Sequence, residues 1–127
     1  MARRRVSSGT EWESTVWYSR AVRADGRVSV AGTTATDDGN PVAPGDPYAQ
    51  TAHALGLVAD ALGEAGASVT DIVRTRLFVT DIDDWEAVGR AHGEMFGEVR
   101  PATTMVAVSR LIHPDLVVEV EVEAVVE

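Results

Sequence analysis

Five stretches of this chain have the hydrophobic and polar pattern of β-strands, with the clearest alternation at 27–33 and in the Glu-Val run at 119–123. The stretches are rich in β-branched residues and span residues 16–22, 27–33, 72–79, 103–108 and 116–126. Asp25 and Gly26 stand between the first two stretches. An Asp-Gly pair in that position predicts a tight hairpin, because both turn positions need a positive φ.

Two other stretches space their apolar residues three and four apart, which is typical of a helix with one buried side. The first opens with Asp46-Pro47, an N-cap followed by proline at the first helical position, and Gly66 is a natural stop. The second begins near Asp83, which has the spacing of a capping box with Glu86. The apolar sides are formed by Leu55, Val58, Ala59 and Leu62, and by Trp85, Val88, Ala91, His92 and Met95.

The resulting element order, β-β-α-β-α-β-β, predicts an α+β fold. Two helices of this size can cover one face of a mixed sheet but cannot cover both faces, as a doubly wound α/β fold requires. The strand residues on the other face are too apolar for free exposure, which favours association with a partner. We expect one domain over residues 1–127, with residues 1–10 as a flexible tail.

Charge and composition exclude several classes of function. A net charge of −9 argues against a nucleic-acid binder, because such proteins neutralise phosphates with clustered Lys and Arg. Arg3-Arg4-Arg5 is the only basic run, and we interpret it as a solvated tail. No apolar stretch approaches the length of a membrane span, so no membrane partner is expected. The chain has no cysteine, which excludes disulfides and thiolate sites and is compatible with a cytoplasmic location.

The common catalytic and metal-binding motifs do not occur. His53, His92 and His113 fall on separate predicted elements without metal-ligand spacing, so we expect no metal. The serines do not lie in a nucleophile elbow, and no glycine-rich phosphate loop is present.

Three stretches of the sequence resemble the Rid family of reactive-intermediate deaminases, also called YjgF and labelled L-PSP endoribonucleases. Arg100–Arg110, which reads RPATTMVAVSR, and the Glu-Val-Glu-Val-Glu run at 119–123 resemble the C-terminal signature. Asp71–Trp85 resembles the central strand and helix. The resemblance runs from about Tyr18 to Val126 and implies a chorismate mutase-like fold. It also implies a homotrimer with small-molecule clefts between subunits.

The resemblance implies an activity as well. Members of the family hydrolyse enamines and imines, releasing a 2-keto acid and ammonia, without a metal or an organic cofactor. Tyr18 matches the family's aromatic hydroxyl, and Gly32 matches the glycine whose backbone N–H lies beside the ligand. The alternatives are a surface tyrosine and a glycine needed for close backbone packing.

The family's acidic residue, which positions water and passes a proton, corresponds to Glu119 or Glu121. Glu119 aligns with the fewest gaps, whereas the Glu-Val-Glu-Ala ending favours Glu121. A period of two places both residues, with Glu123, on one face of the last strand. The alternative is a solvated acidic face or a charge-protected edge strand.

Three positions depart from the family pattern. Thr103 stands where the family has an arginine that grips a substrate carboxylate, Met105 replaces a cysteine and Gly89 replaces an asparagine. Exchanging a guanidinium for a hydroxyl costs roughly 1–2 kcal/mol of carboxylate binding in a partly solvated site. Either the substrate has no carboxylate, or another cation replaces the arginine. The candidate cations are Arg74, Arg76, Arg100 and Arg110, although Arg74 and Arg76 also suit salt bridges and Arg110 suits a structural role.

The sequence therefore favours hydrolytic deamination of an enamine, an imine or a related reactive metabolite, with weak activity on carboxylate-bearing imines. The alternative is a non-catalytic ligand-binding or interaction protein on the same fold. RNA cleavage, which the older family label suggests, is disfavoured by the acidic charge and by the lack of a histidine pair.

Overall fold

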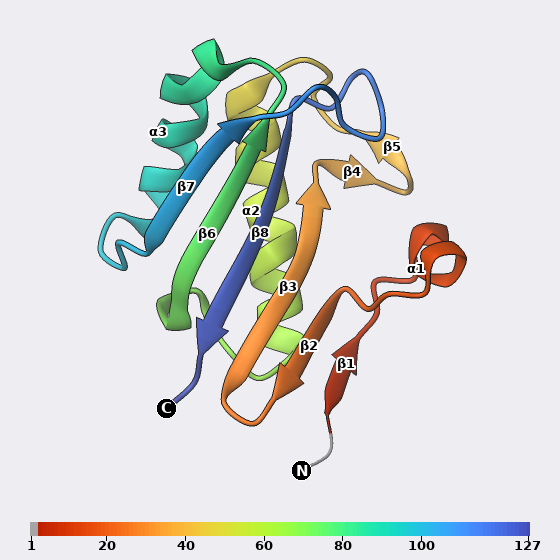
Figure 1. Ribbon diagram of the computed structural model, residues 1–127, viewed down its shortest axis with the longest axis vertical. Coiled ribbons are helices and arrows are strands. Elements are labelled where there is room, and N and C mark those ends of the chain that lie inside the picture. Colours follow the sequence, from red (N-terminus) through yellow and green to blue (C-terminus); the bar gives the residue numbers. More distant parts are fainter. Residues whose placement is uncertain (1–2) are drawn as a thin grey trace.

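Six strands form one mixed sheet in the computed structural model, which describes residues 3–127 (Figure 1). The order across the sheet is β1-β2-β3-β8-β6-β7, with β6 and β7 parallel and all other neighbours antiparallel. This arrangement confirms the predicted α+β class with a mixed sheet. The strands are β1 (Arg4–Val6), β2 (Ala21–Ala24), β3 (Arg27–Thr34), β6 (Ile72–Val79), β7 (Ala102–Ala107) and β8 (Val118–Val125).

Two helices, α2 (Pro47–Glu64) and α3 (Trp85–Phe96), cover the same face of this sheet (Figure 1). The α2 helix begins as predicted, because the Asp46 side chain accepts a hydrogen bond of 3.0 Å from the backbone N–H of Ala49. Beyond its end, Gly66 has a φ of +79°. None of the helices within residues 3–127 is long and apolar enough to cross a membrane.

The start of α3 differs from the prediction. A short 3-10 turn, η2 (Ile82–Asp84), precedes the helix, and the Asp81 side chain caps it by accepting from the backbone N–H of Asp83 at 2.9 Å. The predicted capping box between Asp83 and Glu86 is therefore not the one that forms. A second 3-10 turn, η1 (Val69–Asp71), leads into β6 and has a capping box between Ser68 and Asp71.

The core lies between the helices and the covered face of the sheet. Alternate residues of β8 point into it, and Val118, Val120, Val122 and Ala124 are all buried. They pack against the apolar side of α2, on which Leu55, Val58 and Leu62 are inaccessible to solvent. Burying a side chain such as Leu or Val contributes about 1.5–3 kcal/mol, so this seam is a main source of stability. The residues between them on β8 point to the uncovered face.

The N-terminal part differs most from expectation. The predicted strand over 16–22 is divided between helix α1 (Glu11–Val16) and β2, because Trp17 adopts a left-handed backbone conformation with φ of 67°. The predicted flexible tail contains β1, whose buried Val6 lies opposite Ala21, while residues 1–2 lie outside the described part. Between β3 and α2 the chain forms a small two-stranded ribbon, β4 (Thr36–Asp37) and β5 (Asn40–Pro41).

The predicted hairpin joins β2 to β3, but its glycine serves another purpose. Asp25 has a φ of 55°, whereas Gly26 is not among the residues with positive φ. A Cβ at Gly26 would lie 2.4 Å from the carbonyl oxygen of Val126. The backbone N–H of Val126 donates to the Gly26 carbonyl at 2.6 Å. The glycine is therefore required by the close approach of the chain that follows β8.

Candidate functional site

An irregularity in the pairing of β3 with β8 creates the centre of the candidate site. Val30 lies opposite Val122, but the next pair is Thr33 with Val120, so β3 carries one residue more than β8 between them. This is the pattern of a β-bulge, which bends a strand and redirects its side chains. Gly32 lies in the bulge, and a Cβ there would be 2.7 Å from Oε2 of Glu119. The missing side chain thus provides the space that the Glu119 carboxylate occupies.

Glu119 is half-buried on the uncovered face, between Thr34 of β3 and Phe78 of β6. Burial raises the pKa of its carboxyl, the like charge of Glu121 raises it further, and the positive charge of Arg20 opposes both effects. A carboxylate with a raised pKa in a groove is a candidate for general acid–base work, because its protonation state changes closer to neutral pH.

The other two carboxylates of β8 are held by arginines of β6. Nη1 of Arg76 lies 3.0 Å from Oε1 of Glu121, and Nε of Arg74 lies 3.7 Å from Oε2 of Glu123. Such partly exposed pairs contribute about 0.2–1 kcal/mol each. Glu119 itself forms no ion pair within residues 3–127. Of the two glutamates that the resemblance offers, Glu119 is the one whose carboxylate remains free for a ligand.

Tyr18 lines the same groove as this carboxylate, and Arg20 organises the surroundings of the tyrosine hydroxyl. Nη2 of Arg20 donates to the Tyr18 hydroxyl at 3.1 Å, and Nη1 donates at 2.9 Å to both the Gly32 carbonyl and Oγ1 of Thr33. Sequence reasoning missed Arg20. The signal in the sequence was its position two residues after Tyr18, because that spacing places two side chains on the same side of an extended chain.

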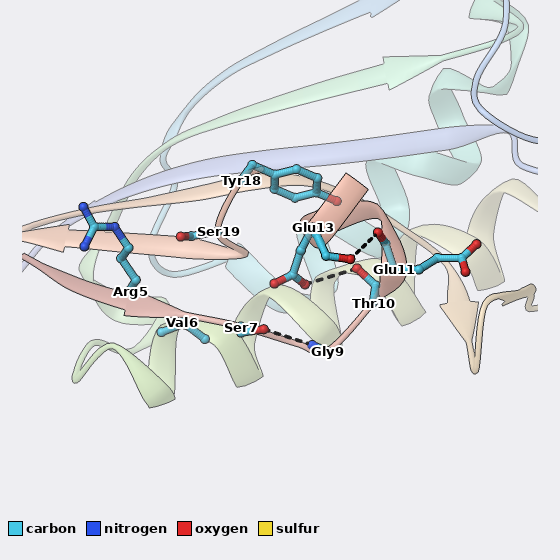
Figure 2. A pocket seen from close by; sticks show the side chains of 10 residues that line it. Arg5, Val6, Ser7, Gly9, Thr10, Glu11, Glu13, Tyr18 and Ser19 are labelled. Atoms are coloured by element: carbon cyan, nitrogen blue, oxygen red, sulfur yellow. Dashed lines mark hydrogen bonds between the residues drawn. The ribbon is translucent and has the colours of Figure 1, made fainter. Parts of the chain in front are cut away.

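These residues line a broad groove together with helix α1 and the loop before β8. Its other walls include Trp12, Val16, Thr34, Ile112 and His113. A smaller pocket adjoins it at α1, where Glu13 points toward Thr10 (Figure 2). The buried Glu13 carboxylate accepts hydrogen bonds from the side chain and backbone of Ser8 and from the Thr10 hydroxyl, which holds α1 next to Tyr18.

Thr103 and Met105 lie on the opposite face of the sheet, toward α3. They pair with Thr75 and Leu77 of β6, both of which are buried. Oγ1 of Thr103 is 2.8 Å from Oγ1 of Thr75 and 3.4 Å from Nε2 of His92, and Met105 packs against the core. One chain therefore does not bring Thr103 and Met105 together with Glu119.

The remaining predicted site residues are placed as follows. Arg100 is exposed in the turn before β7 and has a φ of 52°. Gly89 lies within α3, where a Cβ would meet nothing within 4 Å. Within residues 3–127 no cluster of three or more His, Cys, Asp and Glu side chains is suited to hold a metal ion.

A family match, solved structures and curated relatives all indicate the same family for this chain. Residues 9–126 match the family described as Endoribonuclease L-PSP. A solved structure from Mycobacterium tuberculosis, described as a member of the YjgF/YER057c/UK114 family, superimposes with a TM-score of 0.90 at 51% identity, covering 98% of this chain and 100% of that chain.

Two further relatives carry functional descriptions of their own. The 3-aminoacrylate deaminase RutC of Acinetobacter baylyi is 36% identical over 104 residues, which are 81% of this chain and 82% of the relative. The structure of E. coli TdcF with bound serine matches with a TM-score of 0.79 at 28% identity, covering 87% of this chain and 88% of that chain.

Proposed function

Because this chain belongs to the endoribonuclease L-PSP family, also called the YjgF or Rid family, we propose that it hydrolyses a small imine or enamine. In this reaction water adds to the carbon of the C=N bond, the C–N bond of the resulting carbinolamine breaks, and a carbonyl compound and ammonia leave. A relative described as a 3-aminoacrylate deaminase supports this class of reaction. We place the reaction in the cytoplasm, with which the absence of cysteine is compatible.

The observation that carries the proposal is the space made by Gly32 for the carboxylate of Glu119. Glu119 in its ionised form takes a proton from the attacking water and passes it to the imine nitrogen, which gives the neutral carbinolamine. It then takes the proton of the carbinolamine hydroxyl and delivers it to the departing nitrogen as the C–N bond breaks, so that both protons of the water end on ammonia. Its raised pKa suits both steps, because burial brings the protonated and ionised forms closer in free energy. The Tyr18 hydroxyl orients the substrate from the side of β2.

The proposal includes a homotrimer, in which Thr103 and Met105 of one chain approach the Glu119 groove of its neighbour. The separation of these residues on opposite faces of one sheet supports a site built from two chains. Exposed Val73 and Val106 on the β6–β7 side support association there, since they are 46% and 43% exposed. Arg100 remains the candidate cation of that edge, whereas Arg74 and Arg76 are held by glutamates.

A second candidate function is ligand binding without turnover. The observation in its favour is Thr103, whose hydroxyl is engaged with Thr75 and offers no positive charge where the family has an arginine. A binding protein would keep the groove and its ligand without accelerating hydrolysis.

The test compares two imines that differ only in a carboxylate. The probes are 2-iminopropanoate and propan-2-imine, generated in situ by flavin-dependent oxidation of alanine and of isopropylamine. Ammonia release above the rate in buffer is expected from wild type with propan-2-imine and weakly, if at all, with 2-iminopropanoate. Glu119→Gln should lower the enzymatic rate about a hundredfold or more. Thr103→Arg should raise activity on 2-iminopropanoate about tenfold.

Glu123→Gln is the matched control. Glu123 lies on the same strand and face as Glu119 but is paired with Arg74, so its substitution should leave the rate unchanged. If wild type accelerates neither imine while either compound still binds, the non-catalytic alternative replaces this proposal. Equal losses in both glutamate variants would instead contradict the role given to Glu119.

A further inference from the structure

Arg20 directly precedes β2, at the end of the β2–β3 pairing beyond which β3 continues. The last backbone contact between them is the N–H of Ala31 donating to the Arg20 carbonyl at 2.9 Å. Beyond that point β3 runs on to Thr34. The guanidinium of Arg20 takes over as donor there, with bonds of 2.9 Å to the Gly32 carbonyl and to Oγ1 of Thr33. Hydrogen bonds from a charged donor are stronger than neutral ones, so Arg20 braces the bulge that accommodates Glu119.

The same guanidinium determines what the Tyr18 hydroxyl can do. Arginine has five N–H donors and no acceptor, so the oxygen of Tyr18 must be the acceptor in the 3.1 Å contact with Nη2. A phenol carries one hydrogen, which is then left to donate elsewhere. Within residues 3–127 the Tyr18 hydroxyl donates no hydrogen bond. The hydroxyl therefore has its hydrogen free to donate into the groove, and a ligand atom that receives it is an acceptor, such as a carbonyl oxygen or an imine nitrogen.

Arg20 is also the arginine nearest the chemistry. The chain has no lysine, and among residues 3–127 Arg20 is the one arginine that lines the groove. The charged groups that face Glu119 are Arg20 from the start of β2 and Glu121 from its own strand, and Arg76 of β6 is turned to Glu121. Arg20 thus supplies the opposing charge that favours the ionised carboxylate.

One atom of Arg20 argues against a purely structural role. Its Nε is enclosed by the protein and has no hydrogen-bond partner within residues 3–127. Leaving a buried donor of a charged group unpaired costs stability. Such local costs are concentrated at functional sites, where a side chain is held for what it does to its neighbours.

We propose that Arg20 is a positioning residue of this site, which fixes the Tyr18 hydroxyl as a hydrogen-bond donor to the ligand and holds the Gly32 bulge against Glu119. The inference rests on the proposed function for its catalytic consequence and on the contacts above for its structural part. It makes Tyr18 selective for an acceptor atom on the substrate.

The experiment compares Arg20→Gln, Arg20→Lys and Tyr18→Phe with a matched control, Arg23→Gln. Arg23 lies on β2, three residues after Arg20, and like Arg20 it donates to carbonyl oxygens, those of Asp25, Ala65 and Gly66, but it does not line the groove. Two readouts are needed. One is the titration of the Glu119 carboxyl followed by carbon NMR, and the other is kcat and KM with propan-2-imine.

Arg20→Gln should move the Glu119 titration to higher pH, because an opposing positive charge is lost, and should lower kcat roughly tenfold to a hundredfold. Arg20→Lys keeps a charge but loses the planar fork, so it should preserve the Glu119 titration while kcat stays low. Tyr18→Phe should remove little more activity in the Arg20→Gln background than Arg20→Gln alone removes. Arg23→Gln should change neither readout.

An unchanged Glu119 titration in Arg20→Gln, with losses that add to those of Tyr18→Phe, would overturn the proposal. A response of Arg23→Gln equal to that of Arg20→Gln would do so as well. Should Arg20→Gln fail to fold, Arg20→Lys still tests the proposal. A wild-type kcat in Arg20→Lys would show that the planar guanidinium group is not needed for positioning. If wild type releases no ammonia from any imine, the NMR titration still tests Arg20, and that result counts against the proposed function alone.

Discussion

Gly32 leaves room for the carboxylate of Glu119, because the Cβ of any other residue at position 32 would lie 2.7 Å from Oε2 of the glutamate. Gly32→Ala therefore forces the carboxylate to move. The atoms in the way belong to the end of a flexible side chain, so the unfolding free energy should change by only about 0.5 kcal/mol, whereas the displaced carboxylate should lower kcat about a hundredfold. Urea denaturation and the imine assay measure the two effects.

Gly56→Ala is the control for that substitution. Gly56 lies within α2, and a Cβ there would meet nothing within 4 Å. The helix should gain about 0.5–1 kcal/mol of stability with no change in activity. Gly32→Ala with wild-type kcat would show that the position of the Glu119 carboxylate is unimportant for turnover.

The raised pKa of Glu119 predicts how stability depends on pH. A carboxyl whose pKa is higher in the folded state favours folding fully below its unfolded value of 4.5, and that contribution is lost as pH rises through the folded pKa. Glu119→Gln removes this dependence and should be more stable than wild type at pH 7. Its advantage should shrink as the pH falls toward 4.5. Denaturation curves at several pH values test this, and an advantage independent of pH would contradict it.

The lowered pKa of His92 predicts that its contribution to stability depends on pH in the opposite sense to that of Glu119. It is half-buried on α3, where burial lowers the pKa of its imidazole, and its Nε2 lies 2.8 Å from Oγ1 of Thr75. The neutral folded form contributes fully above the unfolded value of 6.5, and the contribution is lost as pH falls through the lowered pKa. His92→Gln should lose less stability than wild type on acidification below 6.5. Thermal melts across that range measure the difference, and parallel curves would rule the effect out.

Replacing the Trp17 side chain is expected to increase stability. Its φ of 67° is left-handed, which costs a non-glycine residue roughly 1–2 kcal/mol, and its side chain is 90% exposed. Trp17→Gly should raise the unfolding free energy by about 1 kcal/mol. Denaturation at two protein concentrations checks the result. A loss of stability that depends on concentration would mean instead that the indole is buried between copies of the chain.

The parts of the fold that follow from local chemistry were predictable. Asp46 and Pro47 specify the start of α2 by themselves, and the alternation along β8 identifies its buried face. Trp17 was not predictable as a break, because an aromatic residue between Val16 and Tyr18 looks like strand. The left-handed turn there depends on how the rest of the chain packs.

The candidate site was predictable as a set of residue types but not as an arrangement. Periodicity places Glu119 and Glu121 on one face of a strand, yet it cannot show which of them Arg76 neutralises. It also cannot show that Thr103 faces away from both, since that depends on how β7 is set beside β6. The bulge at Gly32 is not marked by any local sequence pattern. The role of Arg20 could not be predicted either, because it depends on the hydrogen bonds that Arg20 makes to this bulge.

The last strand in the chain, β8, lies in the interior of the sheet, with β3 on one side and β6 on the other. During synthesis on a ribosome residues 1–117 emerge before β8, so β3 and β6 cannot be joined through it until the C-terminal residues follow. A sheet whose pairings span such distances in sequence forms slowly. Glu119 is part of β8. A nascent or truncated chain that lacks its final twenty or so residues therefore lacks both the central strand and the Glu119 carboxylate, and its groove cannot be even partly functional.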